Sequence, residues 1–425
     1  MLAWARPHFD HDALFASGAI PFDRHHLTAR PAHPALTAPV TRVGLAEVLR
    51  TFGAAYLATR TLPRGAARVW RAIVACRTAA LGGHRDTCDA CGAIRHVYHS
   101  CRNRHCPTCQ TRAKEAWIAA RRREVLPVPY FHLVFTLPHA LNPLIAAAPQ
   151  VLYENLFGAV SATLTEFAAN PSHLGGVPAF SLVLHTWKQD LGRHVHLHAL
   201  MAGGALTDTG GWIRPKKGFL FPVKALSKVF RGKFVAGLER LYATGRLSAR
   251  VATTADWSRL KRWLYAHDWV VYAKQPLGGP EAVLEYLGRY THRVAISNER
   301  IVRIDGSEVA FRVRGDPVSG KKRVVRLPGA EFIQRFLQHV LPSGFKRIRH
   351  YGLLSAARKK AGLAAARQAL GVPPPQQAVI ESVDDFLRRI RRAEALHCPH
   401  CGGGTFRFTA TLRPERHPLN LRGPP

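Results

Sequence analysis

The stretch HVHLHAL, residues 194–200, sets three imidazoles on alternate positions of an otherwise apolar run. Because successive side chains of a strand point to opposite faces, these histidines line up toward one metal-sized space. The apolar residues between and after them suit a buried strand, which argues against an exposed histidine-rich tail. Tyr286 and Tyr290 lie further along the chain, and a metal beside tyrosines suggests phosphoryl transfer through a covalent intermediate.

The composition indicates a folded protein that binds a polyanion. With 425 residues and 47% hydrophobic content, the chain can bury a sizeable core in about two to four structural units. Lys and Arg total 61 against 27 Asp and Glu, a formal net charge of +34, so the surface repels itself unless a polyanion covers it. We therefore expect nucleic acid as the partner.

No secretory or membrane segment is expected. The first twelve residues lack an apolar signal core, and the most apolar long stretch, 141–164, is interrupted by Pro143, Pro149 and Glu154. Five of the eight cysteines fall within residues 88–109 in metal-like spacing, which fits a reducing compartment. We expect a soluble protein of the cytoplasm.

Two Cys-x2-Cys pairs are separated by fourteen residues. This spacing is typical of two knuckles that share one tetrahedral Zn²⁺, which holds together a segment too short to form its own core. The predicted ligands are Cys88, Cys91, Cys106 and Cys109, with Cys101 and His105 between the knuckles as alternatives.

Basic side chains crowd this cluster, so we interpret it as a module that grips DNA rather than as a catalytic centre. Two further arginines lie beside the tyrosines. The expected DNA-contacting residues are Arg102, Arg104, Arg112, Lys114, Arg289 and Arg293.

Near the C-terminus, Cys398 and Cys401 form half a zinc knuckle. Its missing ligands are sought among His397, His400 and His417. Two free thiols are the alternative.

Within the histidine strand we favour His196 and His198 as the metal pair, because the strand continues beyond them into apolar residues. Gln189, in the preceding turn, is the candidate third ligand, with Asp190 and His185 behind it. An oxygen ligand favours Mg²⁺ or Mn²⁺, whereas a third imidazole favours zinc.

Tyr286 and Tyr290 are four residues apart and share one face of a predicted helix. The metal would polarise a phosphate oxygen, a tyrosine oxygen would attack phosphorus, and the departing sugar would keep a free 3′-OH. The energy of the phosphodiester stays in the phosphotyrosine. Cations such as Lys274, Arg289 or Arg293 would help a tyrosine of pKa near roughly 10 to lose its proton.

Element order predicts a layered domain with an antiparallel sheet, built from strands at 130–135 and 180–187 and the histidine strand, with a helix across 149–169. A β meander is expected at 300–327. The predicted units are an irregular N-terminal arm at 1–40, a helical and zinc-binding domain at 41–125, a catalytic domain at 126–300, a β meander with a helical DNA-binding extension at 301–370, and a linker, basic helix and Cys-containing tail at 371–425.

One motif mimics a phosphate-binding loop, Gly315-x4-Gly320-Lys321. Lys322 replaces the Ser or Thr that would hold Mg²⁺, and the segment lies between two predicted strands. We interpret it as a hairpin turn and expect no ATP.

The chain resembles the two-tyrosine HUH transposases of rolling-circle insertion sequences, the IS91 family. The matching blocks span about residues 45–402, nearly the whole chain, and their order is more specific than any single motif. They are the knuckle region 88–109, His185-Thr-Trp-Lys-Gln189, the histidine strand, Gly203-Gly204, Tyr286-Leu-Gly-Arg-Tyr290, residues 293–298 and residues 341–352.

The resemblance implies an α+β fold: an HUH endonuclease domain with a central antiparallel sheet flanked by helices, an N-terminal helical and zinc-binding domain, and a mostly helical C-terminal region. It implies structural Zn²⁺, and nicking of single-stranded DNA at the element's ends with Mg²⁺ or Mn²⁺ on a bacterial nucleoid. In the family pattern the metal pair maps to His196 and His198, and the nucleophiles of a 5′-phosphotyrosine intermediate map to Tyr286 and Tyr290. Lys188 stands where a glycine is common.

Three rival interpretations remain at this point. A zinc-dependent DNA-binding regulator without chemistry predicts no covalent adduct. A replication initiator or relaxase uses the same HUH chemistry at an origin, although the zinc cluster and the late Arg-rich blocks favour the transposase. A zinc hydrolase built on the three histidines lacks a clear carboxylate base. The DNA end sequence and the oligomeric state are left open.

Overall fold

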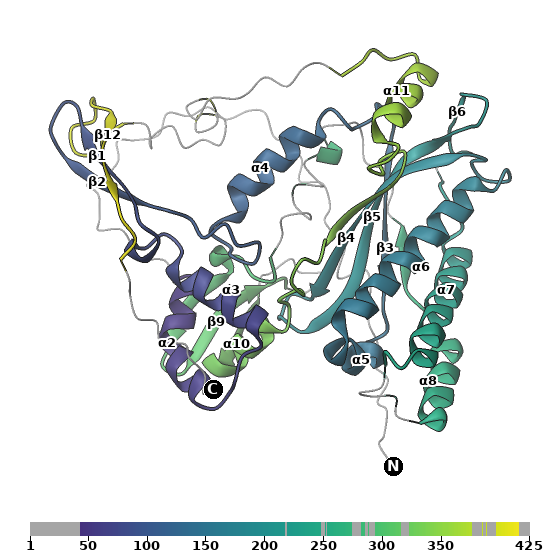
Figure 1. Cartoon of the computed structure of the whole chain (residues 1–425), viewed down its shortest axis with the longest axis horizontal. Helices are drawn as coiled ribbons and strands as arrows, with labels where there is room; N and C mark the ends of the chain where they lie inside the picture. The colour runs from purple at the N-terminus through teal and green to yellow at the C-terminus, as the bar shows by residue number, and fades with distance from the viewer. Residues whose placement is uncertain are drawn as a thin grey trace.

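The computed structural model describes residues 43–216, 219–247, 251, 253–273, 282–284, 288, 294–315, 323–375, 385, 388 and 397–415, without the side chains of 111–113 and 116 (Figure 1). The predicted N-terminal arm, both tyrosines and the turn at 316–322 lie outside this part of the chain, as does nearly all of the last basic helix. Among the described helices, none combines the length and apolarity needed to cross a membrane.

A central antiparallel sheet forms the larger body, in the order β11-β4-β5-β3-β7, with a short β6 paired to β5. The hairpin of β4 and β5 predicted from the histidine strand is its longest part. This confirms the predicted α+β fold with an antiparallel sheet. The strands are β3 (Tyr130–Thr136), β4 (Val177–Trp187), β5 (Arg193–Leu206), β6 (Trp212–Ile213), β7 (Val271–Ala273) and β11 (Ile348–Gly352).

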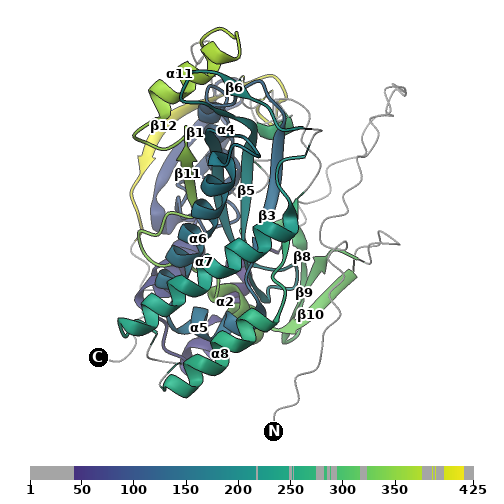
Figure 2. The same ribbon diagram turned by 90° about the vertical axis from the view of Figure 1, so that its right-hand side faces the viewer.

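Helices cover one face of this sheet (Figure 2). Alternate strand residues such as Leu184, Leu197 and Ala199 are buried on this face in one apolar core with the helices. The helix predicted across 149–169 is present at those bounds, with its proline in the first turn, where a missing N–H costs no hydrogen bond. The helices of this layer are α5 (Asn142–Ala147), α6 (Pro149–Ala169), α7 (Val223–Ala243) and α8 (Thr254–Ala266).

The opposite face carries the histidines. At one end of this face, apolar side chains from other segments pack against the sheet. Leu200 is buried there with Val283 and Leu284, in a smaller core that also takes side chains of α11 (Lys359–Ala369).

A second body has its own core of two N-terminal helices, a three-stranded β meander and one later helix. The meander predicted at 300–327 is confirmed. Gly329 begins the later helix against Phe52, where a Cβ atom would lie 2.3 Å from the ring. The elements are α2 (Leu45–Ala58), α3 (Arg64–Ala75), β8 (Ile301–Asp305), β9 (Glu308–Val313), β10 (Arg323–Pro328) and α10 (Gly329–Leu337), with short 3-10 turns η1 (Ala79–Leu81), η2 (His139–Leu141) and η4 (Asn298–Arg300) elsewhere.

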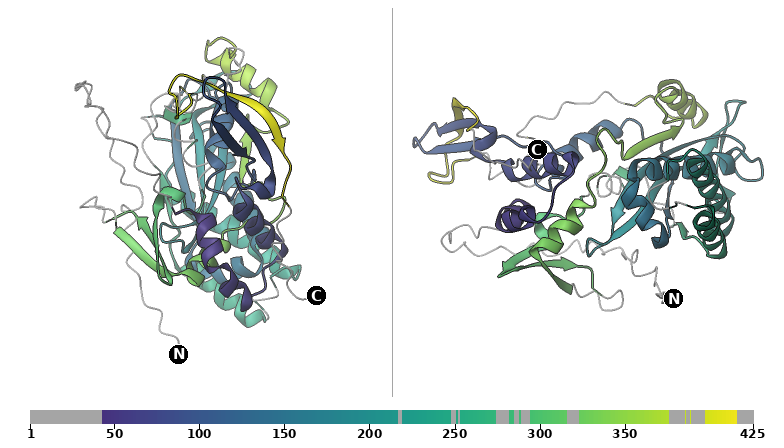
Figure 3. Two further views of the ribbon diagram at one scale, coloured as in Figure 1. Left: turned by 90° about the vertical axis from the view of Figure 1, so that its left-hand side faces the viewer. Right: turned by 60° about the horizontal axis from the view of Figure 1, so that its bottom comes forward.

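The last described strand, near the C-terminus, meets an N-terminal hairpin in a third, small sheet of order β12-β1-β2 (Figures 1 and 3). Strands β1 (Gly83–Cys88) and β2 (Ile94–Tyr98) form a hairpin, and β12 (Phe406–Leu412) pairs antiparallel with β1. From this region α4 (Gln110–Arg121) leads to the central sheet. Two segments therefore cross the predicted unit boundaries, because β12 joins an N-terminal hairpin and β11 forms the edge of the central sheet.

The turn between β4 and β5 docks into the second body through Leu191. This side chain is 0% exposed and its backbone has a φ of 64°, a conformation that costs a leucine about 1–2 kcal/mol. Its carbonyl accepts hydrogen bonds from Gln338 Nε2 at 2.8 Å and His339 Nε2 at 2.9 Å. The Thr186 hydroxyl donates to Nδ1 of His339 at 3.1 Å, which fixes the neutral tautomer with its proton on Nε2.

Burial lowers the pKa of His339 from 6.5 to about 4. Between these values the unfolded chain binds a proton that the folded chain excludes, so the stabilising effect is complete above pH 6.5 and is lost as the pH falls toward 4. His339→Gln keeps a donor for the Leu191 carbonyl without a titrating ring. We expect urea unfolding to show about 2 kcal/mol less loss of stability between pH 7.5 and 5 in this variant than in the wild type. Equal losses in both proteins would contradict the assignment.

Candidate catalytic and metal sites

Three buried histidines converge on one face of the central sheet. His185 of β4 lies directly opposite His196 of β5, and His198 follows two residues later on the same face. The three side chains are 3%, 8% and 4% exposed, and one ring nitrogen from each lies within 4.8 Å of the others. The arrangement offers three imidazole ligands to one ion.

Hydrogen bonds orient these rings. His196 Nδ1 donates to the carbonyl of His194 at 3.0 Å, so in the neutral ring Nε2 carries the lone pair that could bind a metal. His198 Nδ1 lies 2.8 Å from Nε2 of the fully buried His132 on β3. The Nε2 atoms of His196 and His198 are then 3.1 Å apart. Partners behind the ligand atoms are what holds a metal site in shape.

The remaining candidates around the histidines lie as follows. His194 directs Nδ1 to Nε2 of His139 at 3.0 Å, and it is not one of the three converging residues. Asp190 lies in the hairpin turn and forms an ion pair with Lys188 at 3.3 Å. Gln189 occupies the same turn, and its role as the third ligand stays a prediction. His185, which the sequence placed behind it, supplies the third nitrogen because the strand register sets it opposite His196.

The eight cysteines form two clusters of four sulfurs, and this corrects the predicted zinc set. The predicted ligands Cys88, Cys91, Cys106 and Cys109 do not meet at one point. The first cluster is Cys76, Cys101, Cys106 and Cys109, and the second is Cys88, Cys91, Cys398 and Cys401.

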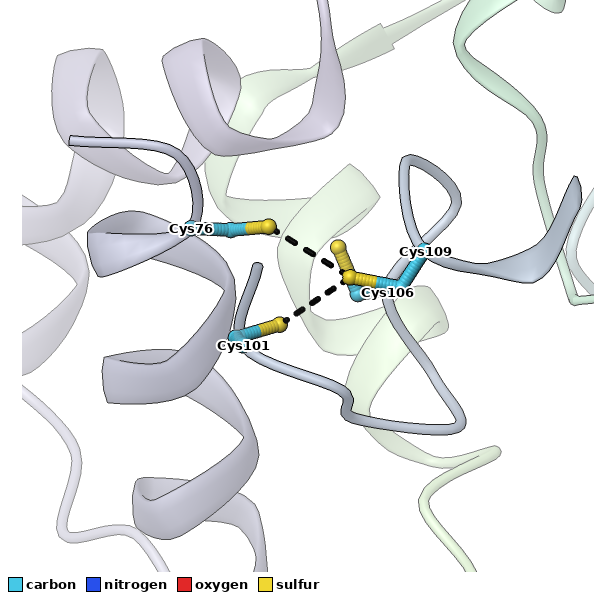
Figure 4. A group of neighbouring side chains, drawn as sticks. All are labelled: Cys76, Cys101, Cys106 and Cys109. Atoms are coloured by element: carbon cyan, nitrogen blue, oxygen red, sulfur yellow. Dashed lines mark hydrogen bonds between the residues drawn. The ribbon is translucent and has the colours of Figure 1, made fainter. Parts of the chain in front are cut away.

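Both clusters fit Zn²⁺. A tetrahedral ion with Zn–S bonds of about 2.3 Å sets its sulfurs about 3.8 Å apart. In the first cluster the Sγ atom of Cys109 lies 3.5 Å from that of Cys76 and 3.6 Å from that of Cys101 (Figure 4). In the second cluster the corresponding distances are 3.8 Å for Cys88–Cys401 and 3.7 Å for Cys91–Cys398. Hydrogen bonding with Cys106 raises the pKa of Cys101, because neighbouring thiols do not readily lose their protons together. A bound cation would stabilise the thiolates.

The strand between the knuckles explains the correction. Cys88 and Cys91 lie at the tip of the β1–β2 hairpin, whereas Cys106 and Cys109 precede α4. The five-residue strand β2 lies between Cys91 and Cys106 and extends about 17 Å, so it carries the first knuckle away from the second. Each knuckle then takes its partners from another part of the chain.

Three further residues settle the ligand sets. Cys101, an alternative in the sequence analysis, is a member of the first cluster. His105, the other alternative, lies outside both clusters, because Nε2 accepts from the amide of Leu341 at 3.2 Å and Nδ1 faces Asn103 Oδ1. Cys76, a single cysteine after α3 without a Cys-x2-Cys signature, was missed. The half knuckle Cys398–Cys401 is completed by cysteines and not by the histidines considered.

The predicted DNA-contacting residues have different surroundings. Arg102 is exposed, whereas Arg104 is half-buried and donates to the carbonyls of Pro342 and Phe345. Lys114 on α4 lies 3.8 Å from the carboxylate of Glu115. The side chain of Arg112, and all of Arg289 and Arg293, lie outside the described residues, as do Tyr286 and Tyr290.

Comparison with known proteins gives the context of these sites. The family described as "Putative transposase" matches residues 179–361, which include the three histidines, and the family described as "Transposase zinc-binding domain" matches residues 48–137. The chain is 42% identical to "Putative transposase y4qJ" of Sinorhizobium fredii, over 85% of this chain and 93% of that protein. It is 27% identical to the transposase of insertion sequence element IS801 of Pseudomonas savastanoi, over 67% and 68% of the two chains. No solved structure matches it.

The histidine face and the cysteine clusters thus belong to a DNA-cleaving enzyme with a zinc-binding region. The chain is a member of the IS91 family of transposases. Its substrate is DNA, and the cysteine clusters suit zinc.

Two clusters predict two zinc ions per chain, each removable by itself. Cys76→Ser and Cys401→Ser break different clusters, so each variant should keep one ion, measured by inductively coupled plasma mass spectrometry on the purified protein. Cys76→Ser should also lower the melting temperature more, because Cys106 of that cluster is 1% exposed inside the second core. His105→Gln is the matched control and should keep both ions. A wild-type protein that holds one zinc ion, and keeps it in both Cys76→Ser and Cys401→Ser, would restore the ligand set first predicted.

Proposed function

We propose that this transposase nicks single-stranded DNA at the ends of its element and transfers strands through a 5′-phosphotyrosine intermediate, in rolling-circle transposition on the bacterial nucleoid. The observation that carries the proposal is the convergence of His185, His196 and His198 on one sheet face, with His196 held in the tautomer that leaves Nε2 unprotonated. Family membership supports the DNA substrate.

Tyr286 and Tyr290 are the proposed nucleophiles. Residues 283–284, directly before them, are buried against Leu200, which lies two positions beyond His198 and on the same face of β5. This packing supports a position for the tyrosine segment beside the histidines. Two tyrosines four residues apart would allow a second strand to be cleaved before the first is resolved.

A divalent ion at the histidines, when bound, polarises a non-bridging oxygen of the scissile phosphate. The tyrosine oxygen attacks phosphorus, a bond forms between them, and the bond from phosphorus to the 3′ oxygen breaks. The tyrosine proton ends on that 3′ oxygen. Attack by a 3′-OH of another strand reverses the step and releases the tyrosine. Since the phosphodiester energy is kept throughout, the reaction needs no ATP.

Mg²⁺ or Mn²⁺ is the proposed catalytic ion, with Gln189 as a candidate oxygen ligand. Mg²⁺ prefers oxygen ligands and gives up its waters reluctantly, whereas imidazoles suit transition metals better. By the same rule three histidine nitrogens alone favour zinc, and an oxygen ligand such as Gln189 would shift the preference toward Mn²⁺ more than toward Mg²⁺.

We expect the wild-type protein to form a covalent adduct with labelled single-stranded DNA from its element ends, seen after denaturing electrophoresis. Tyr286→Phe, Tyr290→Phe or both should abolish it, and His196→Ala should reduce it by about 100-fold or more, because a ligand is lost. Mn²⁺ should act at lower concentration than Mg²⁺. Tyr265→Phe, an exposed tyrosine of α8, is the matched control and should keep full adduct formation.

Tight DNA binding with no adduct or cleavage, across several end sequences and both metals, would contradict the proposal. That outcome would favour the DNA-binding regulator without chemistry. An adduct that persists in the double tyrosine variant would instead move the nucleophile to another residue.

A further inference from the structure

A basic hollow lies beside the first cysteine cluster, between α3, the turn that follows Cys101 and the loop after α10. Its volume is about 350 Å³, within the range of ligand pockets in proteins. Polar and basic residues contribute much of its lining, and they come from three separate segments: Arg68, Arg102, Asn103, Arg104, His105 and Ser343.

Three arginines give the hollow a net positive charge. In the part of the chain that the structure describes, no aspartate or glutamate lines it, and Arg68, Arg102 and Arg104 form no ion pair. Guanidinium groups gathered without carboxylates raise the local concentration of anions. The charge is therefore available to a ligand.

The arginines are held in place by different means. Arg104 forms the fixed part, because its guanidinium donates to the carbonyls of Pro342 and Phe345. Arg68, on the exposed side of α3, donates to the hydroxyl of Ser343 at 3.1 Å and so joins two walls of the hollow. Because these arginine side chains are already ordered, less conformational entropy is lost when a ligand binds.

Arg102 has an unusual backbone. Its φ is 51°, in the left-handed region that residues other than glycine, asparagine and aspartate rarely adopt. It directly follows Cys101, whose sulfur belongs to the first cluster, so the cluster holds this turn in shape. Backbone strain maintained in this way is concentrated at functional positions.

Packed residues connect the hollow to the histidines. A neighbouring cavity shares Arg104, His105 and Leu341 with it and reaches Trp187. The ring of Trp187 stacks on His185, with 4.8 Å between the ring centroids. The hollow and the proposed catalytic site are therefore linked through Arg104, Trp187 and His185.

We propose that this hollow binds a backbone phosphate of the single-stranded DNA substrate, next to the nucleotides that reach the histidines. The inference rests on the proposed function and names how the strand is held. Guanidinium forks match phosphate oxygens, while no Phe, Tyr or Trp is present in the described lining to stack on a base. The contact is thus to the backbone and independent of sequence.

The test is equilibrium binding of the full chain to a fluorescent oligothymidylate of roughly 20 nucleotides, followed by anisotropy from about 50 to 200 mM salt. The double variant Arg68→Ala with Arg102→Gly removes two guanidinium groups, and glycine tolerates the positive φ at 102. We expect about tenfold weaker binding, and a slope of log K against log salt that is smaller by about 0.7 for each phosphate that the protein no longer neutralises.

Arg259→Ala is the matched control, since Arg259 is exposed on α8, away from the hollow (Figure 1). It should leave the slope unchanged. Zinc content and melting temperature, measured for each variant, establish that the fold is retained. A double variant that behaves as the control does, or that loses affinity only for a duplex probe of the same length, overturns the proposal.

All binding is measured in the Tyr286→Phe, Tyr290→Phe background, so that no covalent adduct contributes. The two proposals then fail separately. Lack of adduct formation by the wild-type protein refutes strand transfer and leaves the salt slope to judge the hollow. If the wild-type protein forms the adduct and the loss of Arg68 and Arg102 leaves the salt slope unchanged, only the proposed phosphate site is refuted.

Discussion

The alternation of side chains along the β4–β5 hairpin is the constraint on which the rest of the structure depends. One face of these strands closes the main core against α6 and α7, and the other presents His185, His196 and His198. Because the period is two, a slip of one residue would move imidazoles into the core and leucines to the site. Packing of the hydrophobic core therefore fixes the register of the metal site as well.

The hairpin also joins the two larger bodies. Its turn inserts Leu191 into the second core, where that residue lies with Cys106 of the first cysteine cluster. Zinc bound at this cluster would stabilise the same core into which the β4–β5 hairpin inserts its turn. Arg104 adds a second connection, since it lies between two ligands of the cluster and binds the loop that precedes β11. In this fold the zinc-binding region supports the geometry of the histidine face rather than forming a separate appendage.

The second cysteine cluster has a different role, which follows from the size of its sheet. The sheet of β1, β2 and β12 is too small to bury a core, and Ile94 and Phe408 are 60% and 66% exposed. Cross-linking through a metal offsets that deficit, as in other small metal-stabilised domains. Because two of its cysteines are Cys398 and Cys401, the cluster would tie the C-terminal strand to the β1–β2 hairpin.

Local patterns in the sequence determined the elements with strong periodicity, the His196–His198 pair and the assignment of clustered cysteines to zinc. Each of these depends on neighbours within a few residues, which spacing reveals. Only the tertiary structure decided which cysteines share a cluster, that Cys76 joins one of them, and that His185 completes the histidine set. These groupings depend on strand register and on the packing of segments up to 313 residues apart, because a five-residue strand is enough to carry one knuckle away from the next. Sequence spacing does not encode such distances, so the metal-binding residues were recognisable from the sequence while their partners were not.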